Sequence, residues 1–425
     1  MAGKQFFDFY KTIILNIFHN FVVVSSRFYC VRRKNLTIVP KIEILQKKLT
    51  DRINVLQVFM IISRKVMLTI SFFATLCAYA VSGEAGSKPA DTAFVQANCV
   101  SPEKMAEIYE KIKTPYKYGV VVRPPKGMLV DSPSVFRHGK NWYMIYILQD
   151  GAGYSTHLAE SKNLLDWHLL GEILKRKNNA DWDGQQAAGY LALQNCDFYG
   201  DWTLEKFDGK YWMSYLGGAL KGYETDPLSI GMSYSKNPTI AAEWTRLPLP
   251  VLSASDKDSR YFEKLTLYKS NIIRDPQKRL GAEFVMFYNC KTTGGYERIS
   301  MALSDDMKTW RRFGKEPIVD AGKGLSGDPQ VVRLGDIYVM FYFNAFCKNF
   351  PKTAVETFAC STDLIHWTDW NGAPLVVPSE KFDNVYAHKP WVVTDNGIVY
   401  HFYCAVGSEG RVIALATSKN LSKKH

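Results

Sequence analysis

Residues 131–146 read Asp-Ser-Pro-Ser-Val-Phe-Arg-His-Gly-Lys-Asn-Trp-Tyr-Met-Ile-Tyr: a short β run, a tight turn and a second, aromatic-rich β run. β-Branched and aromatic residues are typical of half-buried strands, and the Gly-containing segment between the two runs is a turn signal. The second run recurs along the chain. Its five copies are WYMIY (142–146), YWMSY (211–215), FVMFY (284–288), YVMFY (338–342) and VYHFY (399–403).

Further strands surround each copy and complete a repeating unit. The run that begins each unit is expected at 131–136, 201–205, 270–273, 328–332 and 388–393. A third strand is expected to end at Ser161, Ser235, Ser304, Ser361 and Ser418, and four of these serines are followed by a tryptophan. Units of about 60–70 residues with several strands each are typical of propeller blades. We therefore predict an all-β protein, a five-bladed β-propeller over residues 118–425.

The two ends of this region predict how the ring closes. A propeller must close, because an unpaired strand edge is an aggregation hazard. The last unit lacks a fourth strand, and the run Tyr118–Arg123 before the first unit can supply it. Residues 102–113 have the apolar spacing of a short amphipathic helix outside the ring.

The formal net charge of +12 belongs mostly to residues 1–80, so it does not indicate a nucleic-acid partner. Residues 60–80 read as a signal peptide: Arg64 and Lys65, an apolar stretch, then Ala78-Tyr79-Ala80. We expect residues 1–59 to be a start-site artefact or a disordered extension, with a membrane-associated segment as the alternative. Residues 81–117 are expected to hold a linker and the helix. The protein is predicted to be secreted or periplasmic, with no stable membrane insertion after signal removal.

Cysteine usage leaves the disulfide question open. Beyond the leader the chain has six cysteines, and six thiols allow 15 pairings. No CxxC pair or His/Cys cluster suggests a metal site, so we expect no cofactor, and a structural cation in the central channel stays an open possibility.

In a propeller the innermost strands begin around a central channel, so polar residues at those positions converge although they are far apart in sequence. A single Asp there is more typical of a turn or strand cap. The full set contains three aspartates together with a glutamate and a histidine, which favours a functional site. The set is Asp131, Asp201, Glu263–Lys264, Asp328 and His388–Lys389.

Aromatic and polar residues are predicted to form a rim around these groups. Loops between second and third strands supply Tyr154, Glu224 and Tyr296, and the segment before 189 supplies Gln186. Trp202 lies beside Asp201. Aromatic faces stack on sugar rings, and carboxylates accept hydrogen bonds from hydroxyl groups. Packing is an equally good explanation of each tyrosine alone, but together these residues suit a carbohydrate cleft.

Residues 131–146, with the repeated Ser-x-Asp-x-x-x-Trp at 304–310 and 361–367, resemble glycoside hydrolase family 43 and its relatives. The resemblance covers residues 118–421 and implies a five-bladed glycosidase of the GH43/GH32/GH117-like superfamily. It implies that Asp131 is the general base or nucleophile, and that Asp328 or Asp201 orients the acid. The general acid would be Glu263 or, as in family 117, His388.

Two carboxyl groups are needed because one must protonate the leaving oxygen while the other attacks carbon or activates water. We therefore expect a glycoside hydrolase that releases a terminal or side-chain sugar. Two alternatives stay open. A glycoside phosphorylase would need a basic phosphate pocket, for which Lys264, Lys269 and Lys389 are candidates. A non-catalytic glycan-binding propeller would bind sugar without turnover.

Overall fold

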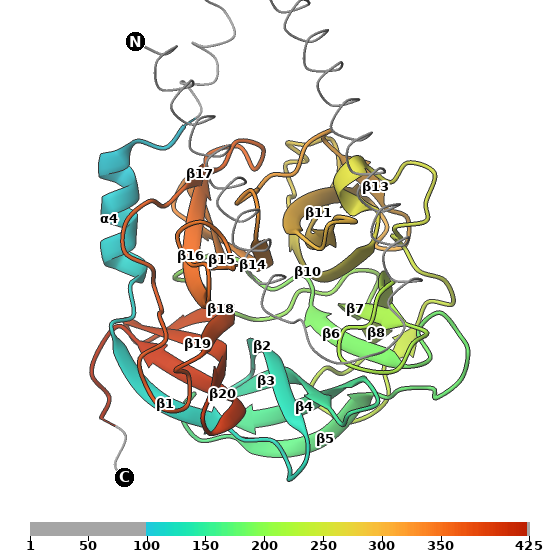
Figure 1. Cartoon of the computed structure of the whole chain (residues 1–425), viewed down its shortest axis with the longest axis horizontal. Helices are drawn as coiled ribbons and strands as arrows, with labels where there is room; N and C mark the ends of the chain where they lie inside the picture. The colour runs from blue at the N-terminus through green and yellow to red at the C-terminus, as the bar shows by residue number, and fades with distance from the viewer. Residues whose placement is uncertain (1–98, 423–425) are drawn as a thin grey trace, which may run out of the picture. The chain divides into compact units, whose positions relative to one another are not determined.

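The computed structural model describes residues 99–422. The predicted leader, residues 1–80, and most of the linker lie outside the described residues. Within them the chain forms one helix, α4 (Pro102–Ile112), and strands that follow one another around a centre (Figure 1). No helix among residues 99–422 is both long enough and apolar enough to span a membrane.

Three of the sheets are four-stranded and antiparallel. The first contains β2 (Leu129–His138), β3 (Asn141–Gln149), β4 (Tyr154–Ser161) and β5 (His168–Leu174). The second contains β6 (Gln186–Leu191), β7 (Tyr211–Gly218), β8 (Ser229–Ser235) and β9 (Thr245–Arg246). The third contains β10 (Thr266–Arg274), β11 (Phe284–Lys291), β12 (Glu297–Ser304) and β13 (Arg311–Phe313), after a 3-10 turn at Tyr261–Glu263.

The remaining strands form one eight-stranded sheet in two antiparallel halves. One half contains β14 (Leu325–Leu334), β15 (Ile337–Ala345), β16 (Ala354–Ser361) and β17 (Thr368–Asp369). The other contains β18 (Tyr386–Asp395), β19 (Ile398–Gly407), β20 (Gly410–Thr417) and β1 (Tyr116–Val122). A single parallel bridge, Ala354 to Tyr386, joins the halves. All five predicted second strands are confirmed, as β3, β7, β11, β15 and β19.

The N-terminal strand pairs with the end of the chain, as the sequence predicts. β1 runs antiparallel to β20, with Tyr116 opposite Thr417 and Val122 opposite Ile413. Because β1 occupies the outer edge of β20, the first and last parts of the described chain hold each other in one sheet. This pairing removes one exposed strand edge.

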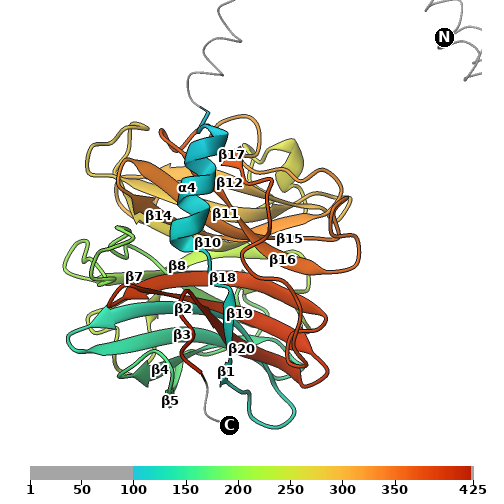
Figure 2. The same cartoon turned by 90° about the vertical axis from the view of Figure 1, so that its left-hand side faces the viewer.

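Helix α4 lies on the outside of the sheets (Figure 2). Its N-cap is Ser101, whose hydroxyl accepts a hydrogen bond from the amide of Lys104 at 3.2 Å. Met105 and Ile108 are buried on the face that meets the sheets. Tyr109 stacks on Trp370 with ring centroids 5.0 Å apart. The predicted amphipathic helix at 102–113 is therefore confirmed.

The predicted first strand of the second unit, residues 201–205, is wrong. Gln186–Leu191 forms that strand instead, although its sequence is Gln-Ala-Ala-Gly-Tyr-Leu. Small residues are poor strand formers, so the segment gives little strand signal. Close packing explains why these residues are small. A Cβ on Gly189, for example, would lie only 2.5 Å from the sulfur of Met213.

The repeated Ser-x-Asn/Asp-x-x-x-Trp segment has the same physical basis in each copy. In the first copy the Ser161 hydroxyl accepts the amides of Asn163 and Leu164, at 3.2 and 2.9 Å. The indole of Trp167 then donates to the Leu164 carbonyl at 3.2 Å. The copies that begin at Ser304 and Ser361 make the same bonds. The motif is therefore a turn that fixes the exit from three of the third strands, β4, β12 and β16.

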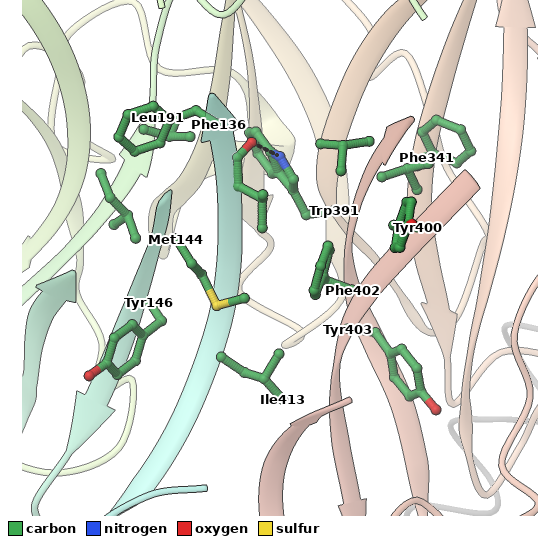
Figure 3. Packing of buried hydrophobic residues seen from close by; sticks show 14 of the residues in the cluster. Phe136, Met144, Tyr146, Leu191, Phe341, Trp391, Tyr400, Phe402, Tyr403 and Ile413 are labelled. Atoms are coloured by element: carbon green, nitrogen blue, oxygen red, sulfur yellow. Dashed lines mark hydrogen bonds between the residues drawn. The ribbon is translucent and has the colours of Figure 1, made fainter. Parts of the chain in front are cut away.

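The core is built from apolar side chains of neighbouring sheets (Figure 3). Phe136 of β2, Leu191 of β6 and Phe402 of β19 are all fully buried. The indole of Trp391 on β18 donates to the Val135 carbonyl on β2 at 2.9 Å. This bond joins the inner strands of two sheets near their middles.

Five cysteines carry unpaired thiols in the structure. They are Cys196, Cys290, Cys347, Cys360 and Cys404. The core of residues 99–422 is therefore held by packing and hydrogen bonds at these positions, without disulfides.

Candidate active site

The polar centre of the protein arises from a backbone irregularity that recurs in four inner strands. In β2, β10, β14 and β18 the ladder is interrupted at equivalent positions. A proline follows the interruption in three of them, and proline cannot donate to the ladder. The interrupting residues all have positive φ angles: Ser132, Lys269, Asp328 and Lys389. Bulges of this kind re-aim side chains, and these four residues line one cavity of about 20 Å³.

The two lysines that line this cavity alternate with three carboxylates, of which Asp328 also lines the cavity. Lys389 Nζ lies 2.7 Å from Asp131 Oδ2 and 3.0 Å from Glu224 Oε1. Lys269 Nζ lies 2.8 Å from the same oxygen of Glu224 and 3.6 Å from Asp328 Oδ1. Both lysines are 3% exposed. Each lysine therefore holds two carboxylates close together in a site from which water is largely excluded.

Asp131 is the most firmly held of the three carboxylates. Its Oδ2 also accepts from Arg411 Nη1 at 2.6 Å, and its Oδ1 accepts the amide of Ser132 at 2.8 Å. Burial favours the neutral acid, but Lys389 and Arg411 outweigh burial and hold the pKa of Asp131 well below its usual range. Asp131 is therefore an ionised group and a poor proton acceptor.

Glu224 comes from the connection between β7 and β8, where its φ angle is 45°. Tyr154 OH donates to its Oε1 at 3.2 Å. Burial would raise the pKa of Glu224, but Lys269 and Lys389 lower it. Glu224 therefore stays ionised at any ordinary pH.

Asp328 is the carboxyl group with the opposite tendency. Burial raises the pKa of Asp328 to about 6, and Lys269 only partly offsets that effect. Its amide donates to Asn289 Oδ1 at 2.8 Å. The Asn289 amide group also lies 3.4 Å from Glu297 Oε2, so a fourth buried carboxylate borders this part of the centre.

His388 lies beside Asp131 but is held in its neutral form. Its Nδ1 is 2.9 Å from the Cys404 carbonyl, which can only accept, so Nδ1 carries the proton. Burial, followed by the charges of Lys389 and Arg411, lowers the pKa of His388 to about 3. Nε2 therefore has no proton to donate at neutral pH.

Asp131, His388 and Cys404 bring three possible metal-ligand atoms within 4.8 Å of one another. The donor set nonetheless suits a cation poorly. Lys389 and Arg411 already neutralise Asp131, and burial raises the pKa of the Cys404 thiol well above its usual range. A metal ion would have to displace two cations and deprotonate a buried thiol.

The predicted rim residues divide into contacting and supporting groups. Tyr154 and Glu224 reach the centre. Gln186 is fully buried and holds the connection that carries Glu224, because its Nε2 donates to the carbonyls of Leu220 and Gly222, each at 2.9 Å. Tyr296 is half-buried, with the Arg298 guanidinium 5.8 Å from its ring centroid.

Glu263 is not brought to the centre. It is fully buried in the third sheet, where its Oε1 accepts from Arg260 Nη2 and Tyr288 OH, each at 2.5 Å. Its Oε2 accepts from Arg312 Nε at 2.8 Å. Burial would raise the pKa of Glu263, but Arg260 and Tyr288 lower it. This geometry is that of a structural ion pair and does not fit a general acid.

Replacing Glu263 by Gln is expected to lower the free energy of unfolding by about 3 kcal/mol, since it leaves buried arginines without their charge partner. Activity per folded molecule should stay near that of the wild type. Urea unfolding followed by fluorescence measures the first effect, and kinetics on the folded variant measures the second. A stable but inactive variant would restore Glu263 as a catalytic candidate.

Asp201 and Trp202 also lie away from the centre. Asp201 is exposed, and its Oδ1 accepts from Asn195 and Thr203. Trp202 is buried, and its indole donates to Thr394 Oγ1 at 3.1 Å. Thr394 lies near the end of β18, whereas His388 lies near its beginning. The sequence prediction misplaces both residues because it assigns 201–205 to the inner strand of the second sheet.

Three residues of the centre have weak sequence signals. Lys269 lies at the bulge of β10, which directs its side chain into the centre, and the sequence suggests it only as a candidate phosphate ligand. Arg411 opens β20 and Asn289 lies within β11, where neither belongs to a repeated motif. Their roles follow from distances that only the fold provides.

No protein-family model matches this protein, and no curated protein does either. Solved structures do match it. BT0996, in the structure of its RGII complex, is 44% identical to this protein; the match covers 76% of this chain and 97% of that one, with a TM-score of 0.73. A structure described as a glycoside hydrolase is 43% identical, with the same coverage and TM-score.

More distant structures share the fold. A family 117 glycoside hydrolase from Zobellia galactanivorans has a TM-score of 0.53 at 12% identity, and it covers 74% of this chain. A thermostable family 43 glycoside hydrolase has a TM-score of 0.50 at 17% identity. At these identities the likeness concerns the fold alone. The two relatives above 40% identity show that the chain belongs to the glycoside hydrolases and is a glycosidase.

Proposed function

We propose that this glycosidase releases a terminal sugar from an oligosaccharide related to RGII, with net retention of configuration. Glu224 is the nucleophile and Asp328 is the acid and base. One observation carries the proposal: two carboxyl groups share Lys269, yet the pKa of Glu224 is lowered and that of Asp328 is raised to about 6. Opposed pKa values at neighbouring carboxyl groups are the mark of divided roles.

The separation of the two groups favours retention. Lys269 Nζ is 2.8 Å from a Glu224 oxygen and 3.6 Å from an Asp328 oxygen. Those two oxygens therefore lie no farther apart than the two distances together. That limit, which applies to the two oxygens nearest Lys269, is compatible with the ~5–5.5 Å between the carboxyl groups of retaining glycosidases.

The reaction then follows two steps. Asp328 donates its proton to the glycosidic oxygen while a Glu224 oxygen attacks the anomeric carbon, so the bond to the leaving sugar breaks and a glycosyl ester forms. The Asp328 carboxylate next takes a proton from water as the water oxygen attacks the same carbon. This releases the sugar, restores Glu224 as a carboxylate and returns the proton to Asp328.

The residues around Asp131 have a positioning role in this proposal. Asp131 has its oxygens occupied by Lys389, Arg411 and the Ser132 amide, so it is poorly suited to act as a base. It fixes Lys389, which contacts Glu224 at 3.0 Å. His388, neutral and without a proton on Nε2, is not proposed as the acid.

We infer a five-bladed propeller for the architecture. The eight-stranded sheet counts as two blades, because only the bridge from Ala354 to Tyr386 joins its halves. We further propose that residues 60–80 act as a signal peptide, that the mature enzyme is secreted or periplasmic, and that catalysis needs no cofactor. The charge neutralisation at the centre supports the last point.

The phosphorylase alternative is weakened by the same contacts. Lys269 and Lys389 each pair with two carboxylates, so neither ammonium group is left to bind phosphate. A non-catalytic glycan-binding protein would bind the sugar without releasing it, and the release experiment below distinguishes the two.

Sugar release is the test of the function. The protein from Val81 onward is incubated with an RGII-derived oligosaccharide and with arabinosyl, xylosyl, fructosyl, galactosyl and anhydrogalactosyl substrates. We expect one sugar to be released from at least one substrate. Glycan binding by titration calorimetry without release from any of them would replace the hydrolase with a binding protein.

A further inference from the structure

Phe346 combines exposure with an unfavourable backbone. It follows β15 directly, its side chain is 45% exposed, and its φ angle is 53°. Bulky residues rarely occupy the left-handed region, where Gly or Asn would be less strained. Because its ring is exposed, Phe346 also contributes little hydrophobic stabilisation to the fold. Backbone strain of this kind, a bulky residue with a positive φ angle, is found preferentially at binding and catalytic sites.

An unbroken series of aromatic contacts runs from Phe346 to the catalytic centre. Phe346 meets Tyr386 edge to face, with centroids 5.7 Å apart. Tyr386 meets His388 in the same way at 6.0 Å. The ligand atoms of His388 and Asp131 lie within 4.8 Å of each other. The series therefore links an exposed ring to His388 and Asp131, beside the catalytic carboxyl groups.

The position of Phe346 relative to Asp328 decides which part of the substrate it can meet. Ala345, the residue before it, pairs with Leu325 at the beginning of β14, three residues before Asp328. Phe346 thus follows β15 at the end of the sheet where β14 begins, and Asp328 lies three residues along β14 from the partner of Ala345. Glu224 comes from a different sheet, on the connection between β7 and β8. The proton donor and Phe346 therefore come from the same pair of strands, whereas the nucleophile comes from another sheet.

We propose that Phe346 and Tyr386 form an aromatic platform that binds the leaving-group sugar, the residue on the far side of the scissile glycosidic bond. This inference rests on the proposed function, because Asp328 must protonate the oxygen of that sugar. The C–H face of a pyranose or furanose ring packs on the exposed ring of Phe346, and Tyr386 holds that ring in place. The occupant is a neutral sugar face and not a charged group.

Substrates with and without a leaving-group sugar separate this platform from the rest of the site. The oligosaccharide carries such a sugar, whereas the glycosyl fluoride of the released sugar does not. Phe346→Asn suits the left-handed backbone and removes the ring, and Phe346→Tyr keeps the ring. Tyr199 is the control, an exposed aromatic residue (65%) that packs on Phe198 in the connection between β6 and β7.

We expect Phe346→Asn to lower kcat/KM for the oligosaccharide by about 10- to 100-fold, the range for loss of one apolar contact surface. Its rate on the fluoride should change less than about twofold, because no contact in that reaction is lost. Phe346→Tyr and Tyr199→Ala should match the wild type on both substrates. The melting temperature of Phe346→Asn should be equal to or above that of the wild type, since strain is relieved.

Three results would overturn the platform. They are an equal loss on both substrates, no loss on either, or a melting temperature clearly below that of the wild type, which would mean that Phe346 is structural. A wild-type protein that cleaves neither substrate would refute the proposed hydrolysis itself, so the two failures are distinguishable.

Discussion

Glu224→Gln is expected to lower kcat by at least about 10⁴-fold, since loss of a nucleophile removes the covalent step. The amide has nearly the same shape and can still accept from Lys269 and Lys389, whose Nζ atoms lie 2.8 and 3.0 Å from Glu224 Oε1. Substrate affinity should therefore change much less than kcat. Steady-state kinetics, with binding measured by calorimetry, separates the two.

Asp201→Asn is the matched control for that variant. Asp201 is an exposed carboxylate bonded to Asn195 and Thr203, so its kinetics should equal those of the wild type. Added azide should partly restore turnover to a Glu224→Gly variant, because a small anion can attack the anomeric carbon in place of the missing carboxylate. Full activity in Glu224→Gln would assign the nucleophile elsewhere.

Asp328→Asn is expected to lower kcat/KM by about 10²–10⁴-fold on a substrate whose leaving group is a sugar. The loss should be small on a glycosyl fluoride or a dinitrophenyl glycoside, because those leaving groups need no proton. The comparison of the two substrate classes is the measurement. If Glu297→Gln gives this leaving-group dependence and Asp328→Asn does not, the proton donor is Glu297.

The pH profile gives the same assignment independently. Hydrolysis needs Asp328 protonated, and burial raises its pKa to about 6, so kcat/KM should fall as the pH rises through about 6. Glu224 has a lowered pKa and stays ionised, so it should add no loss of rate at mildly acid pH. Asp328→Asn should remove the fall above pH 6. A profile with that fall unchanged in the variant would contradict the assignment.

Much of the fold can be predicted from the sequence because the signal is repeated. Five aromatic strands and a recurring Ser-to-Trp turn have local physical causes, such as the bonds from the Ser161 hydroxyl to Asn163 and Leu164. The inner strand of the second sheet is the exception. Residues 186–191 have small side chains because they pack closely against neighbouring strands. The sequence does not show this, whereas the structure places Met213 and Thr156 next to Gly189.

The site is less predictable, for two reasons. Asp131, Asp328 and Lys389 converge as expected, because each lies at or next to the bulge of an inner strand, a position that a repeat alignment can find. In the third sheet the same alignment selects Glu263, whereas the bulge lies at Lys269. An alignment of repeats that is wrong by a few residues cannot be detected from the sequence, because only the hydrogen-bond ladder between the strands shows where the bulge lies.

The division of roles is a property of the fold and not of any motif. Arg411 on β20 contacts Asp131 although the two residues are 280 positions apart in the sequence, and no local sequence pattern predicts this contact. Asp328 and Glu224 are both acidic residues in the sequence. Their opposite pKa shifts come from different balances of burial and of contacts with Lys269 and Lys389.

The stereochemistry of the first-formed product tests the central claim most directly. Proton NMR during the first minutes of hydrolysis identifies the anomer of the released sugar before mutarotation. Glu224 as nucleophile and Asp328 as acid and base predict the same anomeric configuration as in the substrate. An inverted first product would contradict the covalent mechanism and the pairing of these two carboxyl groups.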